Sequence, residues 1–199
     1  MSAHDRVAVL VSGSGRSLEN LIERVRAREI ECEIALVVSS TPKAFALERA
    51  RRHEIPAVVL DPERKLSPED FGRDVFAAAE SFDCRVVVMA GFLRLVRIPS
   101  RWLGRVLNIH PSLLPAFGGK GFYGDRVHKA VLERGVQFTG CTVHYVDNEY
   151  DHGPILLQRC IAVRPDDTPE SLAARVFEEE KIALPDALRL HFERQRAKE

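Results

Sequence analysis

An amide and an imidazole stand two residues apart at the end of an apolar run. The run covers residues 106–109, it contains Asn108, and His110 and Pro111 follow it. If the run is a β-strand, the side chains of Asn108 and His110 point to the same side. An amide N–H could then stabilise an oxyanion while the imidazole handles a proton. On its own, the pair is more typical of a hydrogen-bonded strand end.

An acidic loop supplies a possible partner for this imidazole. Residues 147–151 contain three carboxylates, and Asp151 precedes a Gly-Pro turn at 153–154. A carboxylate beside His110 would favour the charged form of the ring, which prepares it to donate a proton. A solvated hairpin tip is an alternative, and so is a metal site built from His144, Asp147, Asp151 and His152. We expect no metal, because the spacing of these four residues fits no standard metal-binding pattern.

A glycine-rich turn follows the first apolar run and could bind a phosphate. The sequence Ser-Gly-Ser-Gly-Arg-Ser at 12–17 precedes a helical pattern, so backbone N–H groups, Arg16 and Ser17 could all donate to an anion. A dinucleotide fingerprint is disfavoured, because its third glycine would fall at Leu18 and the second strand ends in Ser39-Ser40 rather than in an acidic residue. A tight turn without a ligand remains the alternative.

A third strand end, at residues 90–95, is apolar. Gly91 permits close backbone approach, and Phe92, Leu93 and Leu95 offer surface for a flat ring. Taken alone, packing in the protein core is the favoured explanation of these residues.

Ser112 raises the idea of a nucleophile. The chain contains no G-x-S-x-G motif, so we expect a direct group transfer without a covalent intermediate on Ser or Cys.

Alternating strand and helix patterns must position these groups. Continuous apolar runs at 7–11, 34–38, 57–60, 86–90 and 106–109 are typical of buried parallel strands, and helical patterns follow Ser17, Pro42 and Ser67. After residue 110 we expect a short helix near 127–133, two strands at 138–146 and 155–163, and a long helix over 168–192. The predicted fold is α/β, Rossmann-like: an open, mostly parallel twisted sheet with flanking helices, a late antiparallel pair and a long C-terminal helix. We predict one domain, 1–199, with a nucleotide-binding half (1–110) and a second half (111–199) that contains the folate and catalytic loop and the C-terminal helix.

The amino-acid composition narrows the range of possible functions. The 199 residues carry 29 basic and 29 acidic side chains, so the net charge is zero and a general nucleic-acid binder is disfavoured. The four cysteines are far apart and form no C-x-x-C pair, which is typical of reduced thiols in the cytoplasm. The longest apolar run is too short to cross a bilayer. We therefore predict a cytoplasmic protein, monomeric or homodimeric, that binds small molecules and neither nucleic acid nor membrane.

Four motifs together resemble the phosphoribosylglycinamide formyltransferase family of the formyltransferase superfamily. They occur in order and cover nearly the whole chain: VSGSGRSL at 11–18, AGFLRL at 90–95, LNIHPSLLP at 107–115 and D-x-G-P at 151–154. The resemblance implies transfer of a formyl group from 10-formyltetrahydrofolate, a co-substrate, to the amine of glycinamide ribonucleotide in de novo purine biosynthesis.

The resemblance also implies roles for individual residues. The catalytic residues would be Asn108, His110 and Asp151. The ribonucleotide would be bound by Gly13, Gly15, Arg16, Ser17, Pro111 and Glu180. The folate would be bound by Leu93, Arg94, Leu95, Val96, Asn108, Asp147, Asn148, Glu149, Tyr150 and Asp151, with backbone groups reading the pterin edge.

The chain departs from the family pattern in a glycine-rich loop and at one histidine. Residues 116–124 are longer and richer in glycine than in many members, and we expect a mobile lid there, with Lys120 near a phosphate and His128 on the next helix. His152 replaces a glycine common in the family. Competing functions are a methionyl-tRNA formyltransferase, which would need a further domain and a basic surface, a formyltetrahydrofolate hydrolase, and a non-catalytic nucleotide-binding module.

Overall fold

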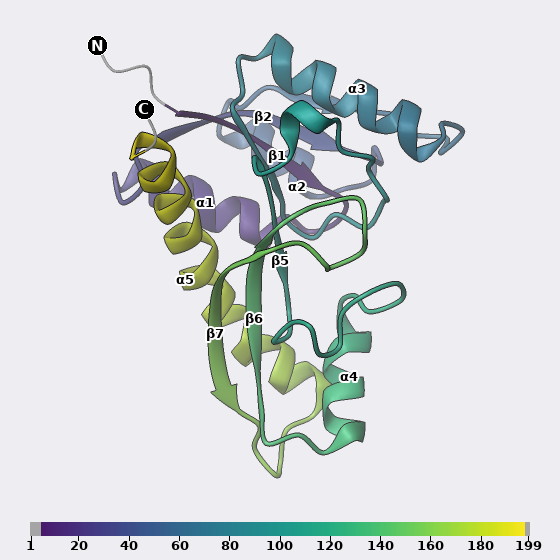
Figure 1. The fold of residues 1–199 in the computed structure, drawn as a ribbon, viewed down its shortest axis with the longest axis vertical. Coiled ribbons are helices and arrows are strands. Elements are labelled where there is room, and N and C mark those ends of the chain that lie inside the picture. The colour runs from purple at the N-terminus through teal and green to yellow at the C-terminus, as the bar shows by residue number, and fades with distance from the viewer. Residues whose placement is uncertain (1–4, 198–199) are drawn as a thin grey trace. The chain divides into compact units, whose positions relative to one another are not determined.

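A computed structural model describes residues 5–197 of the chain, and these divide into two compact units, residues 5–107 and 108–197. The first unit alternates strands and helices (Figure 1): β1 (Asp5–Val11), α1 (Arg16–Arg26), β2 (Cys32–Ser39), α2 (Ala46–Arg52), β3 (Ala57–Val59), α3 (Pro68–Ser81), β4 (Val86–Met89) and a short 3-10 helix, Ser100–Trp102. The second unit contains α4 (Asp125–Arg134), β6 (Phe138–Tyr145), β7 (Ile155–Ala162) and α5 (Pro169–Arg196). Strand β5 (Val106–His110) spans the boundary between the units.

The strands follow the order β3-β2-β1-β4-β5-β6-β7. In the first unit, β1 pairs in parallel with both β2 and β4, and β2 pairs in parallel with β3. In the second unit, β6 and β7 pair antiparallel, with Phe138 opposite Ala162. The predicted fold class is therefore confirmed. The division into a 1–110 and a 111–199 half of a single domain stays a prediction.

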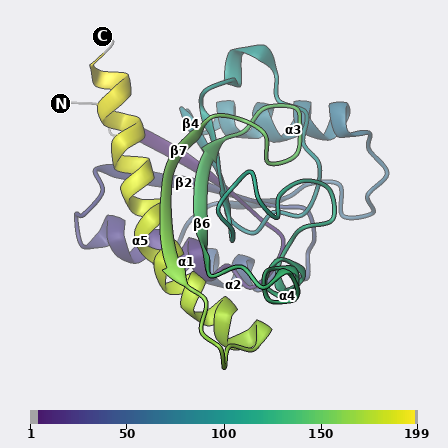
Figure 2. The same cartoon turned by 60° about the horizontal axis from the view of Figure 1, so that its bottom comes forward.

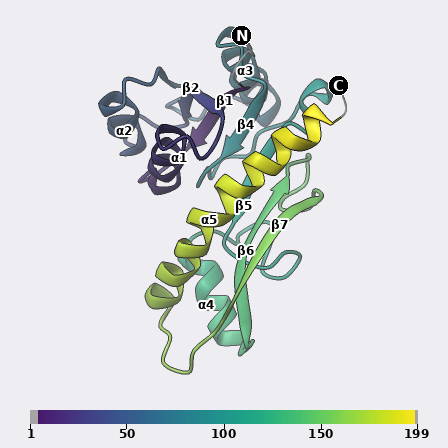
Figure 3. The same cartoon turned by 90° about the vertical axis from the view of Figure 1, so that its left-hand side faces the viewer.

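Helices cover the strands of the first unit on both faces. Right-handed crossovers from β1 to β2 and from β2 to β3 place α1 and α2 on one face, and the return from β3 to β4 places α3 on the other (Figure 3). The central strands are fully buried, including Val7 to Val11 and Val86 to Val88. Their continuous apolar sequence follows from this double cover, because both faces of each strand need apolar side chains.

The helix boundaries follow from local signals. At α3 the Ser67 hydroxyl accepts a hydrogen bond from the Asp70 N–H at 3.0 Å, and Pro68 occupies the first turn. At α5 the side chains of Thr168 and Ser171 cap each other's backbone N–H groups. Helix α1 begins at Arg16, because Gly15 adopts the left-handed conformation (φ 71°) at its N-cap.

In the second unit, α5 packs along β6 and β7 and contacts α4 (Figure 2). Its buried side chains include Leu172, Val176, Leu184 and Leu188. The helix continues through Pro185, as predicted, although proline removes one backbone donor. Among residues 5–197, no helix combines the length and the apolar character needed to cross a membrane.

Candidate active site

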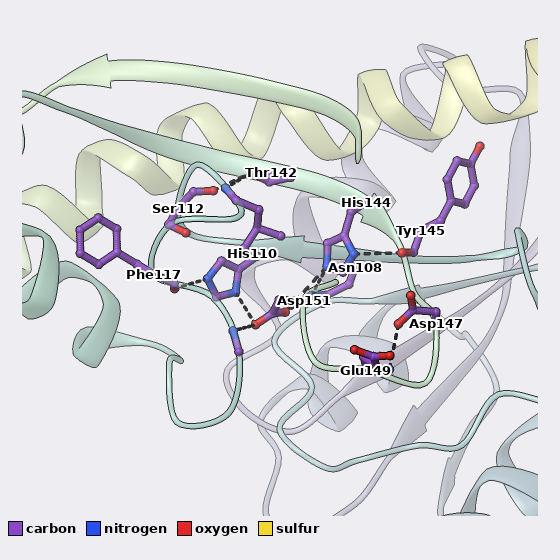
Figure 4. A network of polar contacts seen from close by, with 12 residues as sticks. Asn108, His110, Ser112, Phe117, Thr142, His144, Tyr145, Asp147, Glu149 and Asp151 are labelled. Carbon is purple, nitrogen blue, oxygen red and sulfur yellow. Dashed lines mark hydrogen bonds and ion pairs between the residues drawn. The ribbon is translucent and has the colours of Figure 1, made fainter. Parts of the chain in front are cut away.

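The last residues of β5 carry the predicted amide and imidazole. Asn108 is half-buried and His110 is 4% exposed, and Ile109 between them is buried. Because side chains alternate along a strand, Asn108 and His110 reach the same carboxylate, as Figure 4 shows. The prediction that they share one side of β5 is confirmed.

Asp151 is the carboxylate that they reach. Its Oδ2 lies 3.5 Å from His110 Nδ1, and its Oδ1 accepts a hydrogen bond of 3.5 Å from Asn108 Nδ2. The side chain is 13% exposed. Asp151 has a φ of 52°, a left-handed conformation that aspartate tolerates better than most residues. The acidic loop is therefore more than a solvated hairpin tip, because it delivers a shielded carboxylate to the imidazole.

The glycine-rich loop also contacts these residues. Gly119 N–H donates to Asp151 Oδ2 at 2.9 Å, and His110 Nε2 lies 2.9 Å from the Phe117 carbonyl oxygen. Gly118 sits where a Cβ would lie 2.4 Å from Leu114 Cδ2 and 3.3 Å from Asp151 Cβ. Both ring nitrogens of His110 thus face oxygen acceptors.

Hydrogen bonds within the second unit fix the turn after His110. The Thr142 hydroxyl donates to the Ser112 carbonyl oxygen at 2.7 Å and accepts from Leu114 N–H at 3.0 Å. Gln158 Nε2 donates to the Leu114 carbonyl oxygen at 3.0 Å. The Ser112 hydroxyl donates to the Ala116 carbonyl oxygen at 2.7 Å, so it supports the loop. Ser112 therefore has a structural explanation that involves no nucleophile.

His144 is a site residue whose role the sequence did not reveal. Its Nδ1 lies 3.0 Å from the Tyr145 carbonyl oxygen, which assigns the proton to Nδ1. Nε2 is then an acceptor, and Asn108 Nδ2 donates to it at 3.1 Å. Burial is the main cause that lowers the pKa of His144, so the neutral ring is favoured. The only sequence signal for His144 is its place in the 138–146 strand pattern, next to the acidic loop.

The acidic loop is closed by an ion pair of its own. His152 Nδ1 lies 2.8 Å from Asp147 Oδ2, and Glu149 N–H donates to Asp147 Oδ1 at 2.8 Å. The hydrogen bond that His152 donates to Asp147 raises the pKa of His152. Burial opposes the charge of Asp147, but the bonds from His152 and Glu149 outweigh it and lower the pKa of this carboxyl. His152 therefore points to the start of its own loop. Within residues 5–197, no group of three or more His, Cys, Asp or Glu side chains is placed to hold a metal ion.

The predicted phosphate turn lies in the first unit. Gly13 and Arg16 are exposed, Ser17 is half-buried and Gly15 is buried. Ser12 Oγ accepts a hydrogen bond of 3.1 Å from Leu93 N–H, which connects this turn to the predicted folate segment. These residues are thus presented together at the ends of β1 and β4.

The predicted folate segment, residues 93–96, has mixed exposure. Leu93 is 61% exposed, whereas Val96 is 5% exposed. The Arg94 guanidinium donates to the Leu66 carbonyl oxygen at 2.9 Å and stacks on the Phe71 ring at 3.8 Å from its centroid, and it pairs with Asp61. The Arg94 side chain is therefore engaged within the first unit, and folate binding by residues 93–96 stays a prediction.

The remaining predicted residues are distributed over the second unit. Pro111 follows His110 and is half-buried, as is Glu180 on α5. In the acidic loop, Asn148, Glu149 and Tyr150 are all exposed. Lys120 is exposed, and His128 is buried in the second turn of α4, where burial lowers its pKa. Their predicted roles stay predictions.

A family model described as formyl transferase matches residues 5–188. The chain belongs to the formyl transferase family. A chicken relative, a trifunctional purine biosynthetic protein adenosine-3, is 43% identical over 93% of this chain and 18% of its own length. A chloroplastic phosphoribosylglycinamide formyltransferase from Vigna unguiculata is 39% identical over 88% of this chain and 57% of its own. This formyl transferase thus spans less than two thirds of the curated relatives that it matches here.

Two solved structures are similar over most of both chains. A glycinamide ribonucleotide transformylase 1 from Symbiobacterium toebii has a TM-score of 0.88 at 38% identity, over 95% of this chain and 88% of the other. A phosphoribosylglycinamide formyltransferase from Bacillus halodurans has a TM-score of 0.85 at 36% identity, over 94% of each chain. The predicted resemblance is confirmed, and Asn108, His110 and Asp151 lie inside the matched region of this formyl transferase.

Proposed function

We propose that this formyl transferase transfers a formyl group from 10-formyltetrahydrofolate to the amine of glycinamide ribonucleotide, a step of purine biosynthesis. The observation that carries this proposal is the convergence of Asn108, His110 and Asp151 in one hydrogen-bonded group within the second unit. Relatives named for this activity at about 40% identity support the choice of acceptor.

The proposed chemistry is direct attack. The neutral amine nitrogen forms a bond to the formyl carbon, and the carbonyl electrons move to the oxygen. In the substrate complex, the Asn108 N–H that now faces Asp151 and the His110 Nε2–H that now faces Phe117 would turn to this oxyanion and stabilise it, while Asp151 balances the charge of the ring. The carbon–N10 bond then breaks, and the proton lost by the amine moves to N10 through His110 or a water that it holds. Neither a covalent enzyme intermediate nor a metal is required.

The thiols of the chain fit this proposal, because three of them are poor nucleophiles. Burial raises the pKa of Cys32 and of Cys141 to about 12, and that of Cys84 to about 11. A thiol with such a pKa is almost entirely protonated at neutral pH. The nucleophile in the proposed reaction is therefore the substrate amine.

Binding roles follow from the same proposal. In the first unit, Gly13, Gly15, Arg16 and Ser17 would donate to the phosphate of the ribonucleotide, and residues 93–96 would meet the folate. In the second unit, Pro111 and Glu180 would contact the ribonucleotide, and residues 147–151 the folate. We further propose that the chain works in the cytoplasm, as a monomer or homodimer, on small molecules.

A folate absorbance assay on the purified protein tests the function. We expect formyl loss from 10-formyltetrahydrofolate only when glycinamide ribonucleotide is present. His110→Ala and Asp151→Asn should each lower kcat by about 10²- to 10⁴-fold, because a general acid or its charge partner is lost. Formyl loss without the amine would indicate a hydrolase instead, and transfer to methionyl-tRNA would indicate the tRNA-directed relative.

Circular dichroism and thermal melting show whether these variants remain folded. Glu69→Gln is a matched control, because Glu69 is an exposed carboxylate in the first unit that pairs with Arg97 at 3.1 Å. Near-wild-type turnover in folded His110→Ala would contradict the mechanism.

A further inference from the structure

Helix α2 holds two carbonyl groups of the turn at residues 13–14. Ala46 N–H donates to the Gly13 carbonyl oxygen at 3.1 Å, and Arg49 Nε donates to the Ser14 carbonyl oxygen at 2.9 Å. A carbonyl oxygen bonded to α2 is not available to repel an anion at the start of α1. The two bonds therefore favour the backbone arrangement that an anion site requires.

The same helix fits closely beneath the N-cap of α1. A Cβ on Gly15 would lie 2.6 Å from Ala46 Cβ and 3.3 Å from Arg49 Cδ, and Gly15 has a φ of 71°. The turn and α2 are thus in van der Waals contact, so a substitution of Arg49 would shift the backbone of the turn.

Arg49 is held in place by a carboxylate on α1. Its Nη1 pairs with Glu19 Oε2 at 2.7 Å, and His53 Nε2 lies 2.7 Å from Glu19 Oε1. Burial opposes the charge of Glu19, but the hydrogen bonds from Arg49 and His53 prevail and lower its pKa. A carboxylate in the first turn of α1 would repel a bound phosphate unless its charge were compensated. Arg49 supplies that compensating charge, and His53 contributes a hydrogen bond.

We propose that Arg49 is a positioning residue for the ribonucleotide phosphate, acting through Ser14 and supported by Glu19 and His53. This inference rests on the proposed function, because it assumes a phosphate at residues 13–17. Arg49 would contribute to binding of the ribonucleotide and not to the chemical step, which belongs to Asn108, His110 and Asp151.

Arg49→Gln tests the proposal. We expect the KM for glycinamide ribonucleotide to rise about tenfold, as for loss of one charge-assisted hydrogen bond, while kcat and the KM for the folate change less than about twofold. Arg49→Lys should recover part of the loss, because an ammonium keeps the charge but lacks the guanidinium fork. The matched control is Arg51→Gln on the same helix, since Arg51 is exposed and pairs with Glu48.

Glu19→Gln separates positioning from direct contact. If Arg49 positions the turn, Glu19→Gln loosens Arg49 and raises the same KM, and the double variant is no worse than Arg49→Gln alone. If Arg49 itself bound the phosphate, removal of the Glu19 charge would release it for the ligand and lower that KM. An unchanged or lowered KM in Glu19→Gln therefore overturns the proposal.

Two further measurements keep the test independent of folding and of the proposed function. Calorimetric titration with glycinamide ribonucleotide should show the same tenfold weakening in Arg49→Gln without turnover, and thermal melting reports global destabilisation. A wild-type protein that neither binds nor formylates the ribonucleotide refutes the proposed function. Normal wild-type activity with unchanged ribonucleotide binding in Arg49→Gln refutes the role of Arg49 alone.

Discussion

A buried histidine determines which way the Asn108 amide faces. Because the Nδ1 proton of His144 is committed to the Tyr145 carbonyl oxygen, Nε2 can only accept, and it accepts from Asn108 Nδ2. The donor end of the amide is therefore set by the tautomer of a neighbour. We infer that His144 positions Asn108 in the proposed mechanism without touching the reacting atoms.

His144→Leu should lower kcat by about tenfold or more, because Asn108 loses the acceptor that orients it, whereas KM values should change little. His144→Gln is the conservative variant, since its amide oxygen can accept the same hydrogen bond, and it should retain most of the activity. Steady-state kinetics with both substrates is the measurement. Equal kcat values for the two variants would show that the hydrogen bond is unimportant.

The pH dependence of this contact has a defined sign. Burial lowers the pKa of His144, so protonation occurs only below the usual histidine range. Protonated Nε2 is a donor and cannot accept from Asn108. The contact is therefore intact at neutral pH and is lost as the pH falls through the lowered pKa.

At the scale of elements, the β6–β7 hairpin provides both the carbonyl oxygen that fixes the His144 tautomer and the Asp151 carboxylate. A Cβ on Gly153 would lie 1.9 Å from the Tyr145 carbonyl oxygen, the same oxygen that binds His144 Nδ1. Gly153→Ala should therefore displace the hairpin, lower kcat by about tenfold or more and destabilise the fold by about 1–3 kcal/mol. Enzyme assays and urea unfolding measure the two effects.

Gly104→Ala is the control for this variant. Gly104 has a φ of 75° in the first unit, but a Cβ there would meet nothing within 4 Å. The substitution costs stability through backbone conformation alone, about 1 kcal/mol, and should leave kcat unchanged. Equal catalytic loss in both variants would rule out the proposed effect of crowding at Gly153.

The strand and helix pattern was predictable from sequence because each signal is local. Buried parallel strands need continuous apolar runs, and caps such as Ser67 and Thr168 mark helix starts. The Asn108–His110 pair followed from strand alternation. The proposed roles of His144 and Arg49 could not be predicted, because each depends on which carbonyl oxygen lies within reach once β6 and α2 have packed. Contacts that depend on long-range packing leave no periodic signal in the sequence.

At the scale of the whole molecule, zero net charge means that no general field attracts the two anionic substrates of the proposed reaction. Charge is instead paired locally, as at Glu19 with Arg49 and at Asp147 with His152. Binding of an anion therefore has to come from backbone N–H groups and a few oriented side chains. This agrees with the proposed role of Arg49, which shapes the backbone of the turn.

The cysteines report the integrity of both units in one measurement. Cys32 and Cys84 are buried in the first unit and Cys141 in the second, whereas Cys160 on β7 is exposed. Burial also raises the pKa of each buried thiol, to about 12, 11 and 12 respectively, so these thiols are neither accessible to a reagent nor ionised at neutral pH.

With a disulfide reagent near pH 8, we expect one fast-reacting thiol per native chain and four in denaturant. Cys160→Ser should abolish the fast reaction. The buried thiols should react at least about 10³-fold more slowly than Cys160, because they react only when a unit opens. A second thiol as fast as Cys160 would contradict the packing of the unit that contains it.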